Sequence, residues 1–321
     1  MRHWLLRAIG PVLGLALAVG PAAAADYPSD TIHMIVPWKA GGGTDRLGRG
    51  IAEAMEAVSG ATIVVDNVDG AGGITGSLKV ARSKPDGYTV LMNGTSDMTA
   101  AMTFQKVPVS LDDFKYVGGF FTSPTWILSH KDRGIDSLEA LIAKAKAEPG
   151  TVTIGTAGPA GAQMLMAAAI KGYLDLDVRI VPFSGGADLT KALLGNQVDA
   201  GIIHAPVMLP EVKEGLIKVI GTGRPLTRLA YEPLRGTPTL KDNGIPVEIG
   251  ITRGVFVPKG TPDAVVQKLA AILEKATESD KFKAFAVSFG FEPDWIPGPE
   301  FEAPIRGELK TFQEIKQKYL Q

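Results

Sequence analysis

The chain of 321 residues contains no cysteine and only four histidines. The absence of cysteine excludes disulfide bonds, a thiol nucleophile, a thiolate metal site and a lipid attached to cysteine after export. His33, His130 and His204 are scattered without the spacing of metal ligands, and the sequence contains neither His-Glu-x-x-His nor Gly-x-Ser-x-Gly. We therefore expect no metal, no cofactor and no catalytic residues.

The chain also lacks a cluster of basic residues. It has 33 lysines and arginines against 34 acidic residues, a formal net charge of −1. Nucleic acids and anionic membranes are bound by clustered lysine and arginine, so neither is an expected partner. Hydrophobic residues make up 45% of the chain and charged residues 21%, as in an ordinary globular protein.

No apolar run reaches the roughly 20 residues that a membrane-spanning helix needs. A short apolar run at residues 8–19 follows Arg2 and Arg7, and four alanines at 22–25 precede Asp26. This layout predicts a secretory signal peptide over residues 1–25, removed by cleavage near Ala25. The mature protein would be exported to the periplasm without a membrane anchor. Removing two basic residues from 33 leaves 31 against 34 acidic ones, a formal charge of −3.

Beyond the predicted signal peptide, short apolar runs alternate with amphipathic segments. We expect strands near residues 32–37, 62–65, 88–92, 115–129, 152–155, 178–182, 200–204, 217–222 and 254–257. We expect helices near residues 45–58, 138–147, 161–173, 189–194 and 262–278. Alternating strands and helices predict an α/β fold with mostly parallel sheets covered by helices. In such sheets ligands bind beyond the carboxyl ends of the strands.

Two extended segments indicate a division into two lobes. Residues 116–130 form one long extended run that contains two glycines and Pro124, and residues 217–226 form a second interrupted run. A chain that leaves one lobe and returns to it through such strands has a hinge with a cleft between the lobes. The predicted lobe 1 comprises residues 26–123 plus 225–321, and lobe 2 comprises residues 124–224.

The most informative turn is Val-Pro-Trp-Lys-Ala-Gly-Gly-Gly-Thr-Asp at residues 36–45. Three glycines separate a strand from the start of a helix, where unpaired N–H groups and the helix dipole favour an anion such as a carboxylate. The triplet has neither the third glycine of a dinucleotide fingerprint nor the Gly-Lys-Ser/Thr of a P-loop. A purely structural tight turn is the alternative. Lys39 either pairs with an anionic ligand or lies solvated beside it.

Similar turns follow other strands. The turn at residues 69–77 is more typical of a structural role. Thr95 and Ser96 can donate hydrogen bonds to a carboxylate or cap the next helix. The turns at 155–161 and 182–189 repeat the same device in the second lobe. Trp38 and Phe183 would be apolar walls of a cleft, or ordinary core residues.

Several stretches together resemble the substrate-binding proteins of tripartite tricarboxylate transporters, the TctC-like or Bug family. The mature start, Tyr-Pro-Ser-Asp-Thr-Ile-His-Met-Ile-Val-Pro-Trp-Lys-Ala-Gly-Gly-Gly, is similar to that of the family. Further similarity occurs at residues 64–77, 84–95, 181–202 and 255–262. The resemblance covers nearly the whole mature chain, and the combination is more specific than any one motif.

The resemblance implies a periplasmic-binding-protein fold of type II-like form: two parallel-rich sheets flanked by helices, with a hinge and a central ligand cleft. It implies capture of a small organic carboxylate, held mainly by backbone N–H groups and water. Delivery would be to the large and small membrane subunits of a tripartite tricarboxylate-type transporter. By position, the ligand-binding residues would be Pro37, Trp38, Ala40, Gly41, Gly42, Gly94, Thr95, Ser96, Thr156, Ala157, Gly158, Gly161, Ala162, Phe183, Ser184, Gly185 and His204.

The sequence departs from the family pattern in the second lobe. Ala162 and Met164 stand where members often carry hydroxyl residues and histidine, and Ile203-His204 replaces a common Asp-Asn pair. The distal half of the ligand would then be less polar, or be met by His204, Lys39 or Arg253. A sensor protein that reports ligand to a membrane partner, and less so a secreted enzyme, are the alternative functions.

Overall fold

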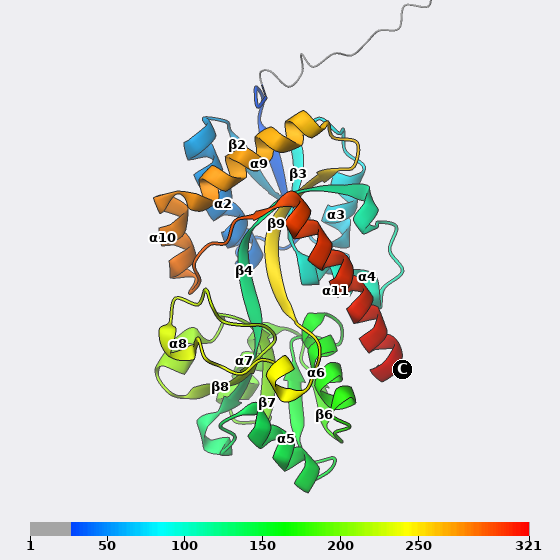
Figure 1. The fold of residues 1–321 in the computed structure, drawn as a ribbon, viewed down its shortest axis with the longest axis vertical. Helices are drawn as coiled ribbons and strands as arrows, with labels where there is room; N and C mark the ends of the chain where they lie inside the picture. Colours follow the sequence, from blue (N-terminus) through cyan, green and yellow to red (C-terminus); the bar gives the residue numbers. More distant parts are fainter. Residues whose placement is uncertain (1–26, 321) are drawn as a thin grey trace, which may run out of the picture.

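The structure, a computed structural model, describes residues 27–320. The predicted signal peptide at 1–25 lies outside these residues. Within them, no helix is both long and apolar enough to cross a membrane. The chain folds as α/β with two lobes, one at each end of the long axis, and two long strands run between them (Figure 1).

The first lobe is built around three parallel strands, with β1 in the middle. The strands are β1 (Ile32–Val36), β2 (Ile63–Asn67) and β3 (Thr89–Gly94). The helices that follow them are α2 (Gly43–Ser59), α3 (Ile74–Ala81) and α4 (Thr95–Phe104), with the 3-10 turn η1 at Ala71–Gly73. Helix α2 forms because Leu47, Ile51 and Met55 recur every fourth residue and are buried on one face.

The second lobe repeats this arrangement with β5 in the middle of three parallel strands. The strands are β5 (Thr153–Thr156), β6 (Arg179–Pro182) and β7 (Ala200–His204), followed by β8 (Ile217–Thr222). Its helices are α5 (Leu138–Ala147), α6 (Ala162–Tyr173), α7 (Gly186–Leu194) and α8 (Leu209–Lys213). The remaining 3-10 turns of the described chain, which are not confined to this lobe, are η2 (Leu111–Asp113), η3 (Lys131–Arg133), η4 (Glu232–Leu234) and η5 (Lys241–Asn243).

The lobes are joined by two antiparallel strands, β4 (Phe114–His130) and β9 (Gly250–Pro258). The first half of β4 pairs with β9, and its second half pairs with β7 and β8. The predicted extended run at 116–130 therefore does pass between the sheets. By contrast, β8 pairs only with the second half of β4, so β9 and not residues 217–226 runs beside β4 in the first lobe. The lobe limits at 124 and 225 stay a prediction.

Not all strands are parallel, because the joining strands pair antiparallel with their neighbours on both sides. The order β2-β1-β3-β9-β4-β7-β5-β6 thus places a parallel trio at each end and antiparallel strands between them. The prediction of parallel-rich sheets is confirmed for the trios, and the middle of the sheet differs from it. Antiparallel pairing lets one long strand belong to both lobes without a crossover helix.

The C-terminal segment returns to the first lobe and then runs along both lobes. It contains α9 (Asp263–Glu278), α10 (Asp280–Ser288), β10 (Ile296–Pro297) and α11 (Gly298–Tyr319). Helix α11 extends beside the joining strands towards α6 (Figure 1). Its buried Phe301 and Ile305 pack in the first lobe, whereas Phe312 and Ile315 pack with the core of the second.

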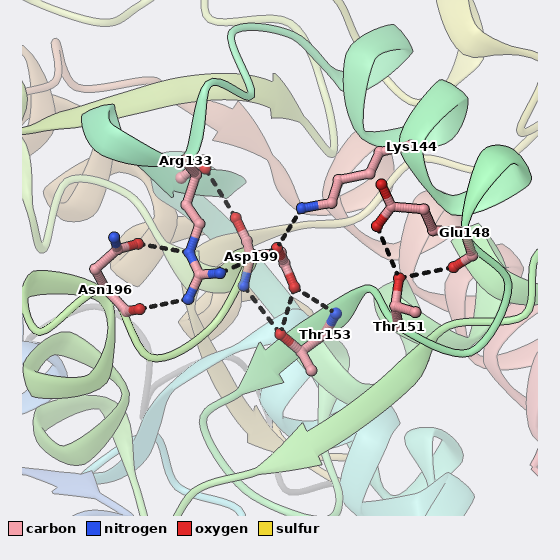
Figure 2. A network of polar contacts seen from close by, with 8 residues as sticks. Arg133, Lys144, Glu148, Thr151, Thr153, Asn196 and Asp199 are labelled. Atoms are coloured by element: carbon pink, nitrogen blue, oxygen red, sulfur yellow. Dashed lines mark hydrogen bonds and ion pairs between the residues drawn. The ribbon is translucent and has the colours of Figure 1, made fainter.

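A buried carboxylate ties the second lobe together at the end of its sheet away from the cleft (Figure 2). Asp199, which is 5% exposed, accepts hydrogen bonds from the backbone N–H and hydroxyl of Thr153, at 2.9 and 2.8 Å. Lys144 of α5 lies 3.1 Å and Arg133 3.3 Å from its other oxygen. Burial alone would raise the pKa of Asp199, but these bonds hold it below its usual range. Asp199 therefore links β5, β7 and α5.

Candidate functional site

The carboxyl ends of the two parallel trios face each other across the joining strands. The last residue of β3, Gly94, pairs with Arg253 of β9, and Arg253 pairs with Phe121 of β4. The last residue of β7, His204, pairs with Thr125 of β4. Phe121 and Thr125 are four steps apart along the strand, a spacing of about 13 Å. The topology thus brings the loops after β1, β3, β5, β6 and β7 to opposite sides of one gap.

A cavity lies on each face of the joining strands. Successive side chains of a strand point to opposite faces, so alternate residues line different cavities. Phe121, Ser123, Ile251 and Arg253 form the floor of a cavity of about 880 Å³, here called the front cavity. It is also lined by Gly43 and Leu47 of the first lobe and, from the second, by residues 204–207, 209, 210 and 213. The alternate residues Thr122, Gly250 and Thr252 line a back cavity of about 360 Å³ beside α11. The front cavity is the larger and has a wall from each lobe.

The first glycine loop is held from below by Asp45, which is 2% exposed. One carboxylate oxygen accepts a hydrogen bond from the Gly41 N–H at 2.8 Å and one from Arg49 at 3.1 Å. The other oxygen accepts from the Asn67 amide at 2.9 Å, and that amide also donates to the Trp38 carbonyl at 2.9 Å. Burial opposes ionisation, but the bonds from Arg49, Gly41 and Asn67 keep the pKa of Asp45 below its usual range. The loop is thus fixed before any ligand arrives.

The start of α2 opens into the cleft. Gly42 precedes the helix in an extended conformation, and its carbonyl accepts the first helical bond, from the Arg46 N–H at 2.9 Å. Gly43 lines both the front cavity and an adjoining hollow with Trp38, Lys39 and Gly42. First-turn N–H groups have no partner within their own helix and carry the positive end of the dipole. A carboxylate fits this position.

The second loop, at the end of β3, is tightly packed. The Gly94 N–H donates to Asn93 Oδ1 at 2.8 Å, and Thr95 Oγ1 accepts from the Thr252 N–H at 3.2 Å. The Ser96 hydroxyl is fully buried and has no hydrogen-bond partner among residues 27–320. Trp38 Nε1 donates to Asn93 Oδ1 at 3.2 Å, which joins the first and second loops. Asn93, absent from the sequence-based predictions, therefore positions both.

The second-lobe loops lie at the ends of β5 and β6. Thr156 Oγ1 donates to the Gly158 carbonyl at 2.9 Å, and the Phe183 N–H donates to the Thr156 carbonyl at 2.9 Å. Gly158 and Gly161 have φ values of 129° and 121°, which favour glycine. Gly161 and Gly185 precede α6 and α7. Two further helix starts therefore lie at the carboxyl edge of the second sheet.

Two ionisable side chains, Arg253 and His204, line the floor of the front cavity, and Asp97 pairs with Arg253 from outside that lining. Arg253 Nη1 lies 2.5 Å from Asp97 Oδ2, and His204 Nδ1 shares a hydrogen bond with the Thr125 hydroxyl at 3.1 Å. Burial lowers the pKa of His204 to about 4, nearby Asp97 works against this shift and Arg253 adds to it. Near neutral pH the histidine is therefore uncharged. In residues 27–320, no group of three or more acidic or histidine side chains is arranged to hold a metal ion.

Comparison with known proteins agrees with this geometry. The sequence profile described as "Tripartite tricarboxylate transporter family receptor" matches residues 47–318. The chain belongs to this receptor family. A UPF0065 protein of Bordetella pertussis is 31% identical over 296 residues, covering 91% of this chain and 90% of the relative.

Two solved structures of the family resemble this receptor. A TctC solute-binding protein from Polaromonas, solved without ligand, is 27% identical with a TM-score of 0.81, covering 91% of this chain and 100% of that one. MatC of Rhodopseudomonas palustris, solved with bound malate, is 26% identical with a TM-score of 0.70, covering 90% of this chain and 99% of that one. The predicted family and the two-lobed fold are both confirmed.

The predicted ligand residues of the receptor do not all reach one cavity in this structure. His204 lines the front cavity together with Arg253, which the sequence had suggested for the distal end of the ligand. Trp38 and Gly42 line the adjoining hollow with Lys39, and Thr95 lines the back cavity. The other predicted residues lie in the loops described above or at the adjoining ends of strands and helices, and are Pro37, Ala40, Gly41, Gly94, Ser96, Thr156, Ala157, Gly158, Gly161, Ala162, Phe183, Ser184 and Gly185. The full contact set stays a prediction.

Sequence reasoning missed several residues of the front cavity. Ser123 and Phe121 lie two positions apart on β4, and this spacing is the one signal that places them on a common face. Tyr231 and Phe289 line the cavity from segments far apart in sequence. No local pattern connects those two residues with the glycine loops.

We expect the partly buried His204 to make receptor stability depend on pH. Between pH 6.5 and about 4 the unfolded chain binds a proton that the folded protein does not accept, so the free energy of unfolding falls as pH falls through this window. His204→Gln should remove this component. The measurement is urea unfolding of both proteins at pH 7.5, 5.5 and 4.5. A difference between the two proteins that stays constant across these pH values would contradict the assignment.

Proposed function

We propose that the protein is a periplasmic solute-binding protein that captures a small carboxylate-containing metabolite between its two lobes. The observation that carries the proposal is the opposition of the two carboxyl edges, with the start of α2 facing the front cavity. The malate bound to the related MatC supports the carboxylate class. The predicted signal peptide at 1–25 supports export.

Capture would combine a fixed anion-binding site in the first lobe with movement of the second lobe onto the ligand. The carboxylate would dock against N–H groups at the start of α2, a loop that Asp45 already holds in place. The loops after β3, β5 and β6 would contribute further backbone groups, some through ordered water. Bending of β4 and β9 would bring His204 and its neighbours onto the far end of the ligand. Binding of this kind requires no catalytic residue.

Delivery would be to the large and small membrane subunits of a tripartite tricarboxylate-type transporter. The family description and the lack of a membrane-spanning helix in residues 27–320 support a separate membrane partner. A sensor role would use the same closed state, and a neighbouring gene for a sensor kinase would favour it over transport. Chemical conversion of a bound acid by the purified protein would instead favour the alternative that the protein is a secreted enzyme.

The test is a thermal-shift screen of residues 26–321 against di- and tricarboxylates, aromatic acids, amino acids and their amides. A ligand that binds only the folded state stabilises it by about 2.7 kcal/mol at one hundred times its dissociation constant. We expect a clear shift with at least one acid and none with its amide. The screen is repeated after unfolding and refolding, which removes any ligand retained during purification. Absence of a shift with every acid after refolding would contradict the proposal.

A further inference from the structure

The front cavity is lined by three cations, and two of them, Arg46 and Lys213, are exposed. The Arg46 guanidinium lies 4.6 Å from the centre of the Phe289 ring, and the Lys213 ammonium lies 5.3 Å from that of Tyr231. The floor residues Phe121 and Ile251 are at most 2% exposed. The two exposed positive charges therefore stand at the mouth, in water, and the floor consists mainly of apolar side chains and Arg253.

The one cation of the floor is already neutralised. Arg253 is 9% exposed and pairs with Asp97 at 2.5 Å. Its guanidinium lies against the backbone of Gly94, where a Cβ would collide with Nη1. Packing and pairing together hold it in place. An anion brought to this floor would lose its water beside an arginine whose charge Asp97 already balances, so the loss of hydration is not offset.

The remaining polar group of the floor suits an uncharged partner. His204 uses Nδ1 to bond the Thr125 hydroxyl, and Nε2 has no hydrogen bond to any residue in the described part of the chain. A neutral imidazole nitrogen hydrogen-bonds a hydroxyl or a carbonyl and offers an anion no compensating charge. The floor as a whole thus accepts an apolar body with at most one uncharged polar group.

Taken with the proposed carboxylate seat at the start of α2, on which this inference rests, we infer that the ligand is a monocarboxylate. Its far end is uncharged and largely apolar, as in a medium-chain or aromatic acid. Its carboxylate lies towards Gly43 and the mouth, and its body extends over Phe121 and Ile251 to His204. Acids with a second carboxylate at the far end are disfavoured because that group would lose its water beside an arginine that is already paired with Asp97.

The first experiment measures dissociation constants by titration calorimetry on refolded protein, residues 26–321, with matched pairs of acids. The pairs are butyrate and succinate, hexanoate and adipate, and benzoate and terephthalate, each differing by one distal carboxylate. In every pair that binds we expect the monoacid to bind about tenfold or more tightly than the diacid. A diacid that binds as tightly or more tightly overturns the inference and leaves the proposed function standing. If none of the six acids binds but the thermal-shift screen identifies a tricarboxylate or an amino acid, the inference is overturned and the proposed function stands; failure of the whole screen overturns both.

The second experiment changes the floor without changing its size. Asp97→Asn leaves Arg253 with an uncompensated charge, so the diacid of the binding pair should gain about tenfold relative to its monoacid. The control is Asp136→Asn, which disrupts an exposed ion pair with Lys218 in the second lobe and should leave the ratio unchanged. An unchanged ratio in folded Asp97→Asn would overturn the role assigned to the pair. If that variant does not fold, the wild-type pairs decide alone.

Discussion

Asp199→Ala is expected to lower the free energy of unfolding by about 3 kcal/mol, because it leaves the buried donors of Thr153 and the partly buried donors of Arg133 and Lys144 without their shared acceptor. The measurement is urea denaturation followed by circular dichroism. Asp199 lies at the opposite end of β7 from His204, so the ligand affinity of the folded variant should change less than about twofold. Destabilisation well below 1 kcal/mol would contradict the role of the network in Figure 2.

A control variant and a pH comparison test the expected effect of Asp199→Ala further. Thr151→Ala, which removes an exposed hydroxyl bonded to Glu148 in the same view, should change stability by less than about 0.5 kcal/mol. Because the folded-state pKa of Asp199 is lowered, its stabilisation is present above about pH 4 and is lost as pH falls through the folded-state value. The stability difference between wild type and Asp199→Ala should therefore be smaller at pH 3 than at pH 7.

Asp45→Ala should weaken both the fold and ligand binding. The change removes the acceptor of the Gly41 N–H and the Asn67 amide, and we expect a loss of about 2–3 kcal/mol in stability. The loop in front of α2 would then sample other conformations, and affinity for the best acid should fall about tenfold or more. The measurements are urea unfolding and calorimetric titration of the same preparation.

The control for Asp45 is Asp69→Ala. Asp69 is an acid near the same hollow, where it lies 4.0 Å from the exposed Lys39, and such pairs contribute little. Its replacement should leave stability and affinity nearly unchanged. Equal losses of affinity in the two variants would show that general charge near the cleft, rather than the fixed loop, controls binding.

Much of the fold could be predicted from local pattern. Strands β7 and β8 and helix α5 have the predicted limits, and the other predicted elements differ by a few residues at their ends. These elements can be predicted because apolar residues recur with the period of the helix or the strand. Helix α11 was missed, since Pro304 interrupts its sequence and charged residues dominate its surface. At α3 and α4 the sequence predicts only turns, because glycine precedes α3 and the hydroxyl residues Thr95 and Ser96 begin α4.

The site was predictable only in part. The glycine loops after β1, β3, β5 and β6 could be found because each follows an apolar run, and the fold does bring them to facing edges. The hydrogen bonds that hold these loops could not be predicted in this way. The use of the Gly41 N–H by Asp45, and of the Gly94 N–H by Asn93, depends on side-chain directions that a spacing rule does not contain.

The sequence alone therefore determined the family, the α/β class, the helix starts with their glycines, and the lack of thiol chemistry. Each of these depends on composition or on residues close together in the chain. Only the tertiary structure decided that β9 pairs with β4, that alternate residues of these strands face different cavities, and that Arg253 meets Asp97 across 156 positions. The reason is physical: local periodicity sets which face of an element is buried, whereas long-range pairing chooses which buried faces meet.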